Sequence, residues 1–565
     1  MKRYELHLVL FTFLLFIGCG GEEQLQSESL KSPFDSTNGY DIRTQRVKNP
    51  SAYIPSMCYT KTEDSVGVHN PCYVCHNRNI EPNPILENET LQKFYDFPAP
   101  ARVNPFKNLF EDFSSDVSKI SDDEITRYVN RSNYIDENGV LILRKNLENL
   151  PETWDMDGDG EWSGYIPDCY YNFDENGFDR ESDGSYTGWV AFAYIPFPGT
   201  FWPTNGSTDD VLIRLPDYFR KFDADGEFNA TVYKVNLSIV ESLVKREDVK
   251  IEPVDERLFG VDLDKDGNIS IASKIKYDWA PTEGRQMYYV GAAKDLQLNG
   301  EIELAAGLFP KGTEFLHSVR YIKSDEKGTV SIAPRMKELR YAKKLFWLTY
   351  ADLKNIAYTR LRNRDLNPER LESFQGNMEI GLSNGQGWVY QGFIEDRYGE
   401  LRPQSYEETL NCMGCHSGIT ATVDSIFSYQ RKIGDWRSGF YHWSQKSLKG
   451  VKEFKYSDGS GEFSTYLKLN GAGDEFRDND EIKERFFLEN GELNTTMVEK
   501  MSEDVSLLLY PSYERAIKLN KAYRALVLEQ KFIDGRAAHV NPVDSVYKEV
   551  DDAKKSGIEV PYILP

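Results

Sequence analysis

Two short stretches of the chain place two cysteines and a histidine at the spacing that holds haem covalently. Residues 72–76 read Cys-Tyr-Val-Cys-His and residues 412–416 read Cys-Met-Gly-Cys-His, two copies of the Cys-x-x-Cys-His pattern. Two thiols three residues apart lie on the same side of a helical turn, where each can add to a haem vinyl group and form a thioether. The adjoining histidine then reaches the iron as its proximal ligand. We therefore expect two covalent haems, held by Cys72, Cys75 and His76 and by Cys412, Cys415 and His416.

The ligand on the other face of each iron decides what such a haem does. A strong sixth ligand favours electron transfer, whereas an open position admits oxygen or peroxide. His317 lies on a strand-like run beside apolar residues and is our first candidate, with a satisfied core histidine as the alternative. His442, between Tyr441 and Trp443, is the second candidate. Other side chains that offer a nitrogen or thioether ligand are His69, His539, Met57, Met336, Met497 and Met501.

Two acidic loops carry carboxylates at alternate positions followed by a glycine, as in the first half of an EF-hand calcium loop. The twelfth position of such a loop holds a bidentate glutamate, but here it is Ile166 or Ser273. Glu161, Asn268 or Ser270, with backbone carbonyls and water, would complete the shell. A solvated acidic turn is the alternative, although three carboxylates this close repel one another without a cation. The candidate calcium ligands are Asp155, Asp157 and Asp159 in the first loop and Asp262, Asp264 and Asp266 in the second.

The first nineteen residues form a targeting segment. Lys2 and Arg3 precede an apolar run over residues 8–17 that is too short to span a bilayer, and Gly18-Cys19 follows it. This segment resembles a bacterial lipoprotein signal, which implies that Cys19 is acylated and becomes the mature N-terminus. Gly20, in place of aspartate, implies passage to the outer membrane in the lipoproteins that it resembles. An ordinary signal peptide with an incidental cysteine is the alternative.

Cys58 and Cys169 remain after the haem motifs and Cys19 are counted. In an oxidising compartment two leftover cysteines often pair, so Cys58 and Cys169 are a candidate disulfide. Two buried free thiols satisfy the sequence equally well. A zinc site built from both Cys-x-x-Cys pairs is a further alternative, but it leaves the histidine directly after each pair unexplained.

The overall composition favours an exported, soluble globular protein. Charged residues make up 28% and hydrophobic residues 40% of the chain. The formal net charge of -23 repels nucleic acids, so no nucleic-acid partner is expected, and it would steer positively charged partners toward the chain.

Composition and periodicity indicate an α+β fold, with two mainly helical c-type haem modules flanking a β- and loop-rich central region. Apolar spacing predicts helices over residues 237–244, 336–361 and 513–530, and a capping box at Ser405 predicts that a helix begins there and runs into His416. An aromatic stretch over residues 188–206 is typical of a plain core or of a wall over a porphyrin. The expected parts are a lipoprotein signal (1–19), a flexible tether (20–48), a first haem module (49–150), the central region with the calcium-type loops (151–334), a second haem module (335–455) and a helical C-terminal segment (456–565).

The order of these features resembles a group of large di-haem c-type cytochrome lipoproteins of Gram-negative bacteria, a poorly characterised group. The resemblance rests on the stretch Asn70-Pro71-Cys72, the acidic loop at 155–160, residues 197–210 and the second haem motif. It implies a di-haem cytochrome that transfers electrons in the periplasm or at the outer membrane, with basic redox proteins as partners. Di-haem cytochrome c peroxidases also combine two such motifs with calcium, so a redox enzyme with one open haem is the alternative. A surface binding module that uses haem only as a structural cofactor is the third possibility.

Overall fold

The structure is a computed structural model of the chain. It describes residues 54–61, 71–76, 82, 88–200, 202–325, 327, 329–367, 372–419, 421–471, 473–474, 477–551 and 553–562. The candidate lipidation site Cys19, the predicted tether and His69 lie outside the described residues. The described residues all belong to one compact unit.

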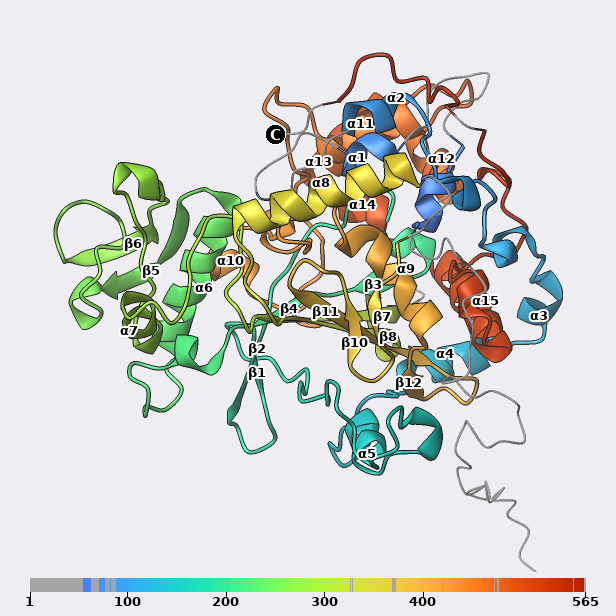
Figure 1. Ribbon diagram of the computed structural model, residues 1–565. Helices are drawn as coiled ribbons and strands as arrows, with labels where there is room; N and C mark the ends of the chain where they lie inside the picture. Colours follow the sequence, from blue (N-terminus) through green and yellow to red (C-terminus); the bar gives the residue numbers. More distant parts are fainter. Residues whose placement is uncertain are drawn as a thin grey trace, which may run out of the picture. The chain divides into compact units, whose positions relative to one another are not determined.

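An antiparallel sheet forms the centre of the structure (Figure 1). Its strands follow the order β1-β2-β4-β7-β8-β11-β10-β9, with β12 paired to β11 and β3 paired to β7. The pairs β5-β6 and β13-β14 form two small separate sheets. The strands are β1 (Phe178–Arg180), β2 (Tyr186–Ala191), β3 (Thr208–Asp209), β4 (Leu212–Arg214), β5 (Val249–Asp255), β6 (Ile271–Ile275), β7 (Glu314–Ser324), β8 (Val330–Lys344), β9 (Gln375–Asn377), β10 (Gly381–Ser383), β11 (Trp388–Glu395), β12 (Leu401–Pro403), β13 (Gly473–Asp474) and β14 (Arg477–Asp478).

Helices surround this sheet, and the elements between β4 and β7 form a lobe at one of its ends, on the left in Figure 1. The helices are α1 (Cys72–Cys75), α2 (Asn88–Lys93), α3 (Ser114–Ser118), α4 (Asp122–Asn130), α5 (Ile142–Glu148), α6 (Ala230–Lys245), α7 (Ala292–Leu298), α8 (Tyr350–Leu366), α9 (Tyr406–His416), α10 (Trp436–Gly439), α11 (Glu462–Asn470), α12 (Asp480–Phe486), α13 (Thr495–Glu503), α14 (Ser506–Leu509) and α15 (Tyr513–Glu529).

Three of the predicted helices are confirmed. Helix α6 covers the predicted stretch 237–244, begins at an Asn229 cap and is buried over most of its length. Helix α9 begins after Ser405, and helix α15 covers residues 513–529. The predicted α+β class is therefore confirmed.

The predicted helix over residues 336–361 is wrong for its first part. Strand β8 continues to Lys344, and helix α8 begins only at Tyr350. The apolar residues Met336 and Leu339, which suggested a helical face, are both buried in this strand, and the pairing of β7 with β8 shifts register between them. Lys337 between them is also buried, where its ammonium donates to the carbonyl oxygen of Gly206 at 2.5 Å. Because polar and apolar residues are buried alike, the polarity pattern of this stretch does not reveal the strand period.

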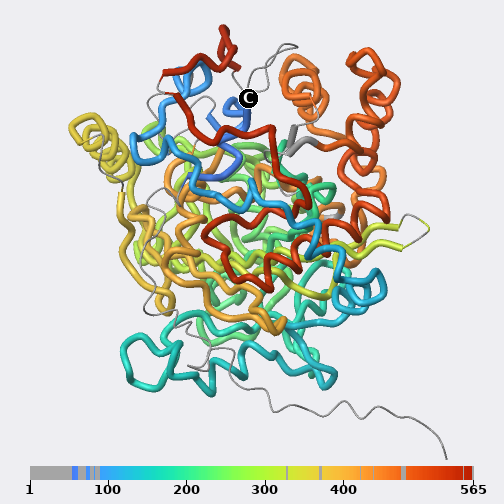
Figure 2. Tube along the Cα trace, turned by 90° about the vertical axis from the view of Figure 1, so that its right-hand side faces the viewer, coloured from blue at the N-terminus to red at the C-terminus, as the bar shows by residue number. Residues whose placement is uncertain are grey.

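The two ends of the described chain run side by side (Figure 2). Isolated β-bridges pair Thr60 with Val546, Phe94 with Lys555 and Val103 with Glu549. The Asn104 amide also donates to the Tyr547 carbonyl oxygen at 3.0 Å. The segment that carries the first haem motif is therefore held by the C-terminal segment.

Candidate functional site

The second haem motif forms the last turn of helix α9, whose first turn is fixed by a capping box. Ser405 Oγ accepts from the Glu408 amide at 3.2 Å, and Glu408 Oε2 accepts from the Ser405 amide at 2.8 Å. Arg402 on β12 then holds the same carboxylate with two hydrogen bonds, at 2.7 Å and 2.8 Å. Arg402 and Glu408 are both buried, so the sheet and the start of the motif helix are tied together.

The first haem motif lies on the short helix α1. The His76 amide donates to the Cys72 carbonyl oxygen at 2.7 Å, and Gln92 Nε2 donates to the His76 carbonyl oxygen at 2.6 Å. Buried Tyr73 donates its hydroxyl to Asn470 Oδ1 of helix α11 at 2.9 Å. These contacts come from three separate segments, and together they fix the orientation of the motif.

Both haem motifs open onto one cavity of about 340 Å³. Cys75 lines it from the first motif, and Cys412, Cys415 and His416 line it from the second. The segment that follows the second motif also contacts the first motif, because the Ala421 amide donates to the Cys75 carbonyl oxygen at 3.2 Å. Motifs that lie far apart in the sequence are therefore neighbours in the fold.

His416 has the arrangement of an iron ligand held by its second nitrogen. Its Nδ1 lies 2.7 Å from the Ser425 carbonyl oxygen, which can only accept, so Nδ1 carries the proton and Nε2 keeps its lone pair. The rings of Tyr390 and Phe427 pack against the imidazole at 4.8 Å and 5.3 Å. Burial lowers the pKa of His416 to about 4, which keeps the imidazole neutral as a metal ligand requires.

The turn that supplies this carbonyl is strained. Asp424 and Ser425 both have left-handed backbone, with φ of 51° and 63°, which costs of order 1–2 kcal/mol for each non-glycine residue. Buried Lys344 binds the Asp424 carboxylate at 2.5 Å, and Ser425 Oγ donates to Gln386 Oε1 at 2.6 Å. Strain held in this way is found at functional sites, and here it aims a carbonyl at His416.

His76 of the first motif differs from His416, because it is not among the residues that line the cavity. Burial lowers the pKa of its imidazole to about 4, so the ring is neutral. Its Nδ1 is buried and has no hydrogen-bond partner among the described residues. A buried polar atom without a partner is uncommon in a finished structure and indicates a missing ligand or solvent molecule.

The candidate distal ligands differ in whether they line the cavity. His317 on β7 lines the cavity, and its Nδ1 lies 2.7 Å from the Asp210 carbonyl oxygen. Burial and the nearby Arg340 lower the pKa of His317 to about 4. Met57, the thioether alternative, lines the same cavity. His317 and Met57 therefore remain the candidates that the geometry supports.

His442 does not fit the role of a distal ligand. Its Nε2 lies 3.0 Å from Asp210 Oδ2, and its Nδ1 lies 2.8 Å from Ser444 Oγ. Both nitrogens are thus occupied, and His442 is not among the residues that line the cavity. His442, the second distal candidate, is a buried histidine in this structure and shares Asp210 with the backbone amide of Ser318.

Cys58 and Cys169 are both free thiols, so the candidate disulfide is not formed and the alternative of two thiols holds. Burial raises the pKa of Cys58, and the nearby Cys72, Cys415 and Cys75 raise it further. Cys169 is buried elsewhere, where burial and then Asp179 raise its pKa. The two cysteines therefore lie in different surroundings, and Cys58 belongs to those of the haem motifs.

The positions of potential metal ligands bear on the zinc and calcium interpretations of the sequence. Among the described residues, groups of three or more ligand atoms within 4.8 Å of one another occur only in the acidic loops. The cysteines of the two haem motifs form no such group, which argues against the zinc alternative. The acidic groups are Asp155, Asp157 and Asp159, and Glu256, Asp262 and Asp264.

Glu256 takes the place that the sequence assigned to Asp266 in the second loop. It is fully buried and comes from the segment before the loop, where Oε1 accepts from the Leu263 amide at 2.5 Å and Oε2 from the Ser270 amide at 2.8 Å. Asp266 instead accepts from the Asn268 amide at 2.7 Å. Glu256 thus joins Asp262 and Asp264 in the group of carboxylates at the second loop, although it lies outside the loop itself.

The first loop is built in the same way. Buried Glu379 accepts from the Met156 amide at 3.0 Å and from the Ser163 amide at 2.8 Å. Met156 and Ser163 are the second and ninth residues of this loop, and Leu263 and Ser270 hold the same positions in the other. Neither glutamate carries a signal in the sequence, because each lies outside its loop.

The predicted aromatic stretch serves as core and as cavity wall. Trp189 and Trp202 are buried core residues, whereas Phe197, Thr200 and Asn205 line the cavity. Part of the stretch therefore belongs to the core, and part of it forms the wall of the cavity.

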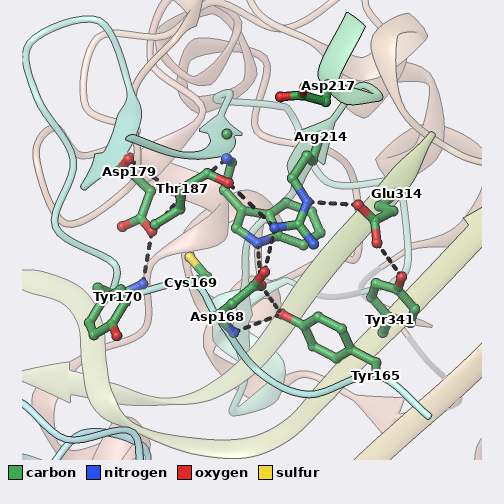
Figure 3. Close-up of polar contacts among 12 residues, drawn as sticks. Tyr165, Asp168, Cys169, Tyr170, Asp179, Thr187, Arg214, Asp217, Glu314 and Tyr341 are labelled. Atoms are coloured by element: carbon green, nitrogen blue, oxygen red, sulfur yellow. Dashed lines mark hydrogen bonds and ion pairs between the residues drawn. The ribbon is translucent and has the colours of Figure 1, made fainter. Parts of the chain in front are cut away.

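A partly buried ion network holds one residue of the cavity wall, Tyr341, in place (Figure 3). Tyr341 lines the cavity and donates its hydroxyl to Glu314. Arg214 binds Glu314 Oε2 at 2.7 Å and Asp168 Oδ2 at 2.5 Å, and Tyr165 donates to Asp168 Oδ1 at 3.0 Å while its ring stacks on Tyr341 at 4.0 Å. These contacts hold the Tyr341 ring in one position.

These features define an α+β protein in which two Cys-x-x-Cys-His motifs share one cavity. A family model described as "-like lipoprotein" matches residues 42–504, most of the chain. A protein of Aquifex aeolicus (strain VF5) named "Uncharacterized lipoprotein" is 30% identical over 584 residues, which cover 93% of each chain. The chain belongs to this lipoprotein family. No solved structure matches it.

Membership of a lipoprotein family confirms the predicted export and lipid anchoring. The coarser part of the resemblance, a lipoprotein, is thus confirmed. Within the part of the chain that the structure describes, every helix is too short or too polar to cross a membrane.

Proposed function

We propose that the chain is a di-haem c-type cytochrome that transfers electrons. The observation that carries the proposal is the shared cavity, onto which Cys75, Cys412, Cys415 and His416 all open. When bound, each haem would supply an iron that alternates between two oxidation states. The chain would hold one haem through Cys72, Cys75 and His76 and the other through Cys412, Cys415 and His416.

The protein's own residues would set the properties of these haems. The Ser425 carbonyl orients His416, and His317 and Met57 are the candidate distal ligands. The apolar part of the wall, which includes Phe197, Phe315 and Phe427, would exclude water from the iron.

The proposal extends to location and partners. Gly20 after the candidate lipidated Cys19 supports an outer-membrane anchor, with the folded part in the periplasm or at the cell surface. The formal net charge of -23 supports redox partners that dock through basic surfaces.

The test is the visible spectrum of the mature protein, produced with cytochrome c maturation machinery, with haem quantified per chain. Two haems with low-spin spectra that do not change with carbon monoxide or peroxide are expected of an electron carrier. A chain without haem would contradict the proposal. One high-spin haem that binds these molecules would favour the alternative, a cytochrome c peroxidase-like enzyme with one open haem.

The shared cavity also predicts how the two haems depend on each other. Replacing Cys412 and Cys415 by alanine removes one haem, and we expect the haem at Cys72 and Cys75 to remain but with a changed absorption maximum and potential. The reason is that the second haem would form part of the surroundings of the first. An unchanged first haem would argue for two independent modules instead.

We also propose that the acidic loops bind Ca²⁺ as a structural cation. In the second loop Asp262 Oδ1 is buried without a hydrogen-bond partner among the described residues. One carboxylate oxygen each of Glu256, Asp262 and Asp264 lie within 4.8 Å of one another. A cation would relieve their repulsion. Calorimetric titration of chelator-treated protein with Ca²⁺ should show saturable binding, and its absence would contradict this proposal.

A further inference from the structure

In the cavity wall near Cys412, two guanidinium groups donate hydrogen bonds to the same carboxylate oxygen. Arg340 Nε and Arg536 Nη1 each lie 2.9 Å from Glu338 Oε2, and Gln404 Nε2 lies 3.0 Å from the same atom. Arg340, Arg536 and Glu338 all line the cavity, and their charges act on the Cys412 thiol. Gly392 makes this arrangement possible, because a Cβ there would lie 2.4 Å from the Gln404 side chain.

The charges in this wall do not balance. Among the described residues of this wall, Arg340 and Arg536 share the one carboxylate of Glu338, because the nearby Glu408 carboxylate is engaged by Arg402 and Glu408 offers Arg536 only its backbone oxygen at 2.6 Å. Elsewhere on the cavity lining the Asp209 carboxylate lies 3.7 Å from His317, and burial lowers the pKa of both His317 and His416. A net positive charge in a buried wall is costly unless an anion compensates it.

Two hydrogen-bond donors in the wall lack acceptors. Tyr523 on α15 is 2% exposed, and its hydroxyl is buried without a partner among the described residues. The same holds for Arg536 Nε. Both residues line the cavity that Cys412 and Cys415 share. Donors left in this way point to an acceptor that enters the cavity as a ligand.

We propose that Arg340, Arg536 and Tyr523 form a carboxylate-binding site, which we call the basic wall, and that its occupant is a propionate of the haem joined to Cys412 and Cys415. This inference rests on the proposed function. A carboxylate supplies the missing negative charge and accepts from both unpartnered donors, and a guanidinium–carboxylate contact is strong because it is charge-assisted. A free carboxylate has the same chemistry, so the experiment separates the two sources.

The experiment compares holoprotein variants by potentiometric titration followed in the visible spectrum. Arg536→Gln removes one cation and one donor, while Glu338 keeps Arg340 and Gln404. Tyr523→Phe removes only the hydroxyl and preserves packing. The matched control is Arg524→Gln, since Arg524 lies next to Tyr523 on α15 but donates to Tyr128 at 2.7 Å and does not line the cavity.

Loss of the cation disfavours the reduced haem, so the reduction potential of one haem should fall in Arg536→Gln. Because loss of the cation also raises the pKa of the propionate, this potential should depend more steeply on pH. Tyr523→Phe should show a smaller change in the same direction, and Arg524→Gln should match the wild type. If the potentials of Arg536→Gln and Tyr523→Phe both match the control, the basic wall is not a carboxylate site.

Titration of the wild-type holoprotein with acetate identifies the source of the carboxylate. A propionate occupant predicts no change in spectrum or potential. A saturable change that disappears in Arg536→Gln would overturn the propionate assignment in favour of a free carboxylate. Failure of the proposed function itself would look different, because the wild-type protein would then contain no haem to titrate.

Discussion

The Arg402–Glu408 pair anchors the helix that presents the second haem motif, and its removal should be strongly destabilising. Arg402 makes two hydrogen bonds to the Glu408 carboxylate, at 2.7 Å and 2.8 Å, and both side chains are at most 1% exposed. Removing one partner of such a pair leaves a buried, uncompensated charge. We expect Arg402→Met to lower the free energy of unfolding by about 3–5 kcal/mol at pH 7.

The pH dependence of this loss follows from the pKa of Glu408. Burial alone raises that pKa, but Arg402 and the other donors outweigh burial and hold it below its ordinary value. In the wild type the carboxylate therefore adds stability above the unfolded-state pKa, and this stability is lost as pH falls through the lower folded-state pKa. In Arg402→Met burial dominates and the folded-state pKa rises above the unfolded-state value. The difference between wild type and variant should therefore shrink as pH falls from 7 toward 4.

Urea unfolding followed by circular dichroism at several pH values measures both effects. The matched comparison is the double variant Arg402→Met with Glu408→Gln, which removes the stranded charge but keeps an acceptor for the Ser405 amide. It should be more stable than Arg402→Met alone. A single variant that loses less than about 1 kcal/mol, or a double variant that is no more stable than the single one, would refute the reasoning.

Two other substitutions test the remaining clusters. Arg214→Gln removes the cation that Asp168 and Glu314 share in the network of Figure 3, and because these side chains are only partly buried it should lower the free energy of unfolding by about 1.5–3 kcal/mol. The control Arg144→Gln breaks a pair whose side chains are 44% and 51% exposed and should cost less than about 1 kcal/mol, so equal losses would count against the first estimate. Chelation of Ca²⁺ should lower the Tm of the wild type, and Glu256→Gln should reduce this difference because it weakens a carboxylate ligand. An unchanged response in Glu256→Gln would exclude its role in binding.

The elements that the sequence predicted correctly were those with local signals. The capping box at Ser405 and the apolar period of helix α15 each depend on residues within one or two turns, and both helices form as predicted. Strand β8 shows the limit of this approach. Its residues Lys337 and Lys344 are buried because Gly206 and Asp424 supply partners from distant segments, and the sequence of the strand alone holds no sign of them.

The same distinction applies to the candidate site. The candidate attachment cysteines and proximal histidines follow from a five-residue pattern. Glu256 lies outside the loop whose amides it accepts from, and Glu379 and the basic wall involve residues far apart in the sequence. His442 shows what the sequence of a lone residue leaves out, because its Nε2 lies 3.0 Å from Asp210, a residue far away in the sequence. A titratable side chain without a local motif can be interpreted only when its partners are known.

The two haem motifs lie far apart in the sequence, which favoured two separate modules. The contacts between the two ends of the chain explain why the motifs are nevertheless neighbours in the fold. Among its described residues, the segment with the first motif contributes no strand to the central sheet, and its bridges at Thr60, Phe94 and Val103 go to the C-terminal segment. That segment follows helix α15, which packs on the sheet and contributes Tyr523 to the cavity. The contacts of the C-terminal segment thus place the first motif beside the second. We therefore expect attachment of haem to the first motif to depend on the C-terminal segment. If haem binds at Cys72 and Cys75 in a chain truncated after residue 534, the C-terminal segment is not what builds the shared cavity.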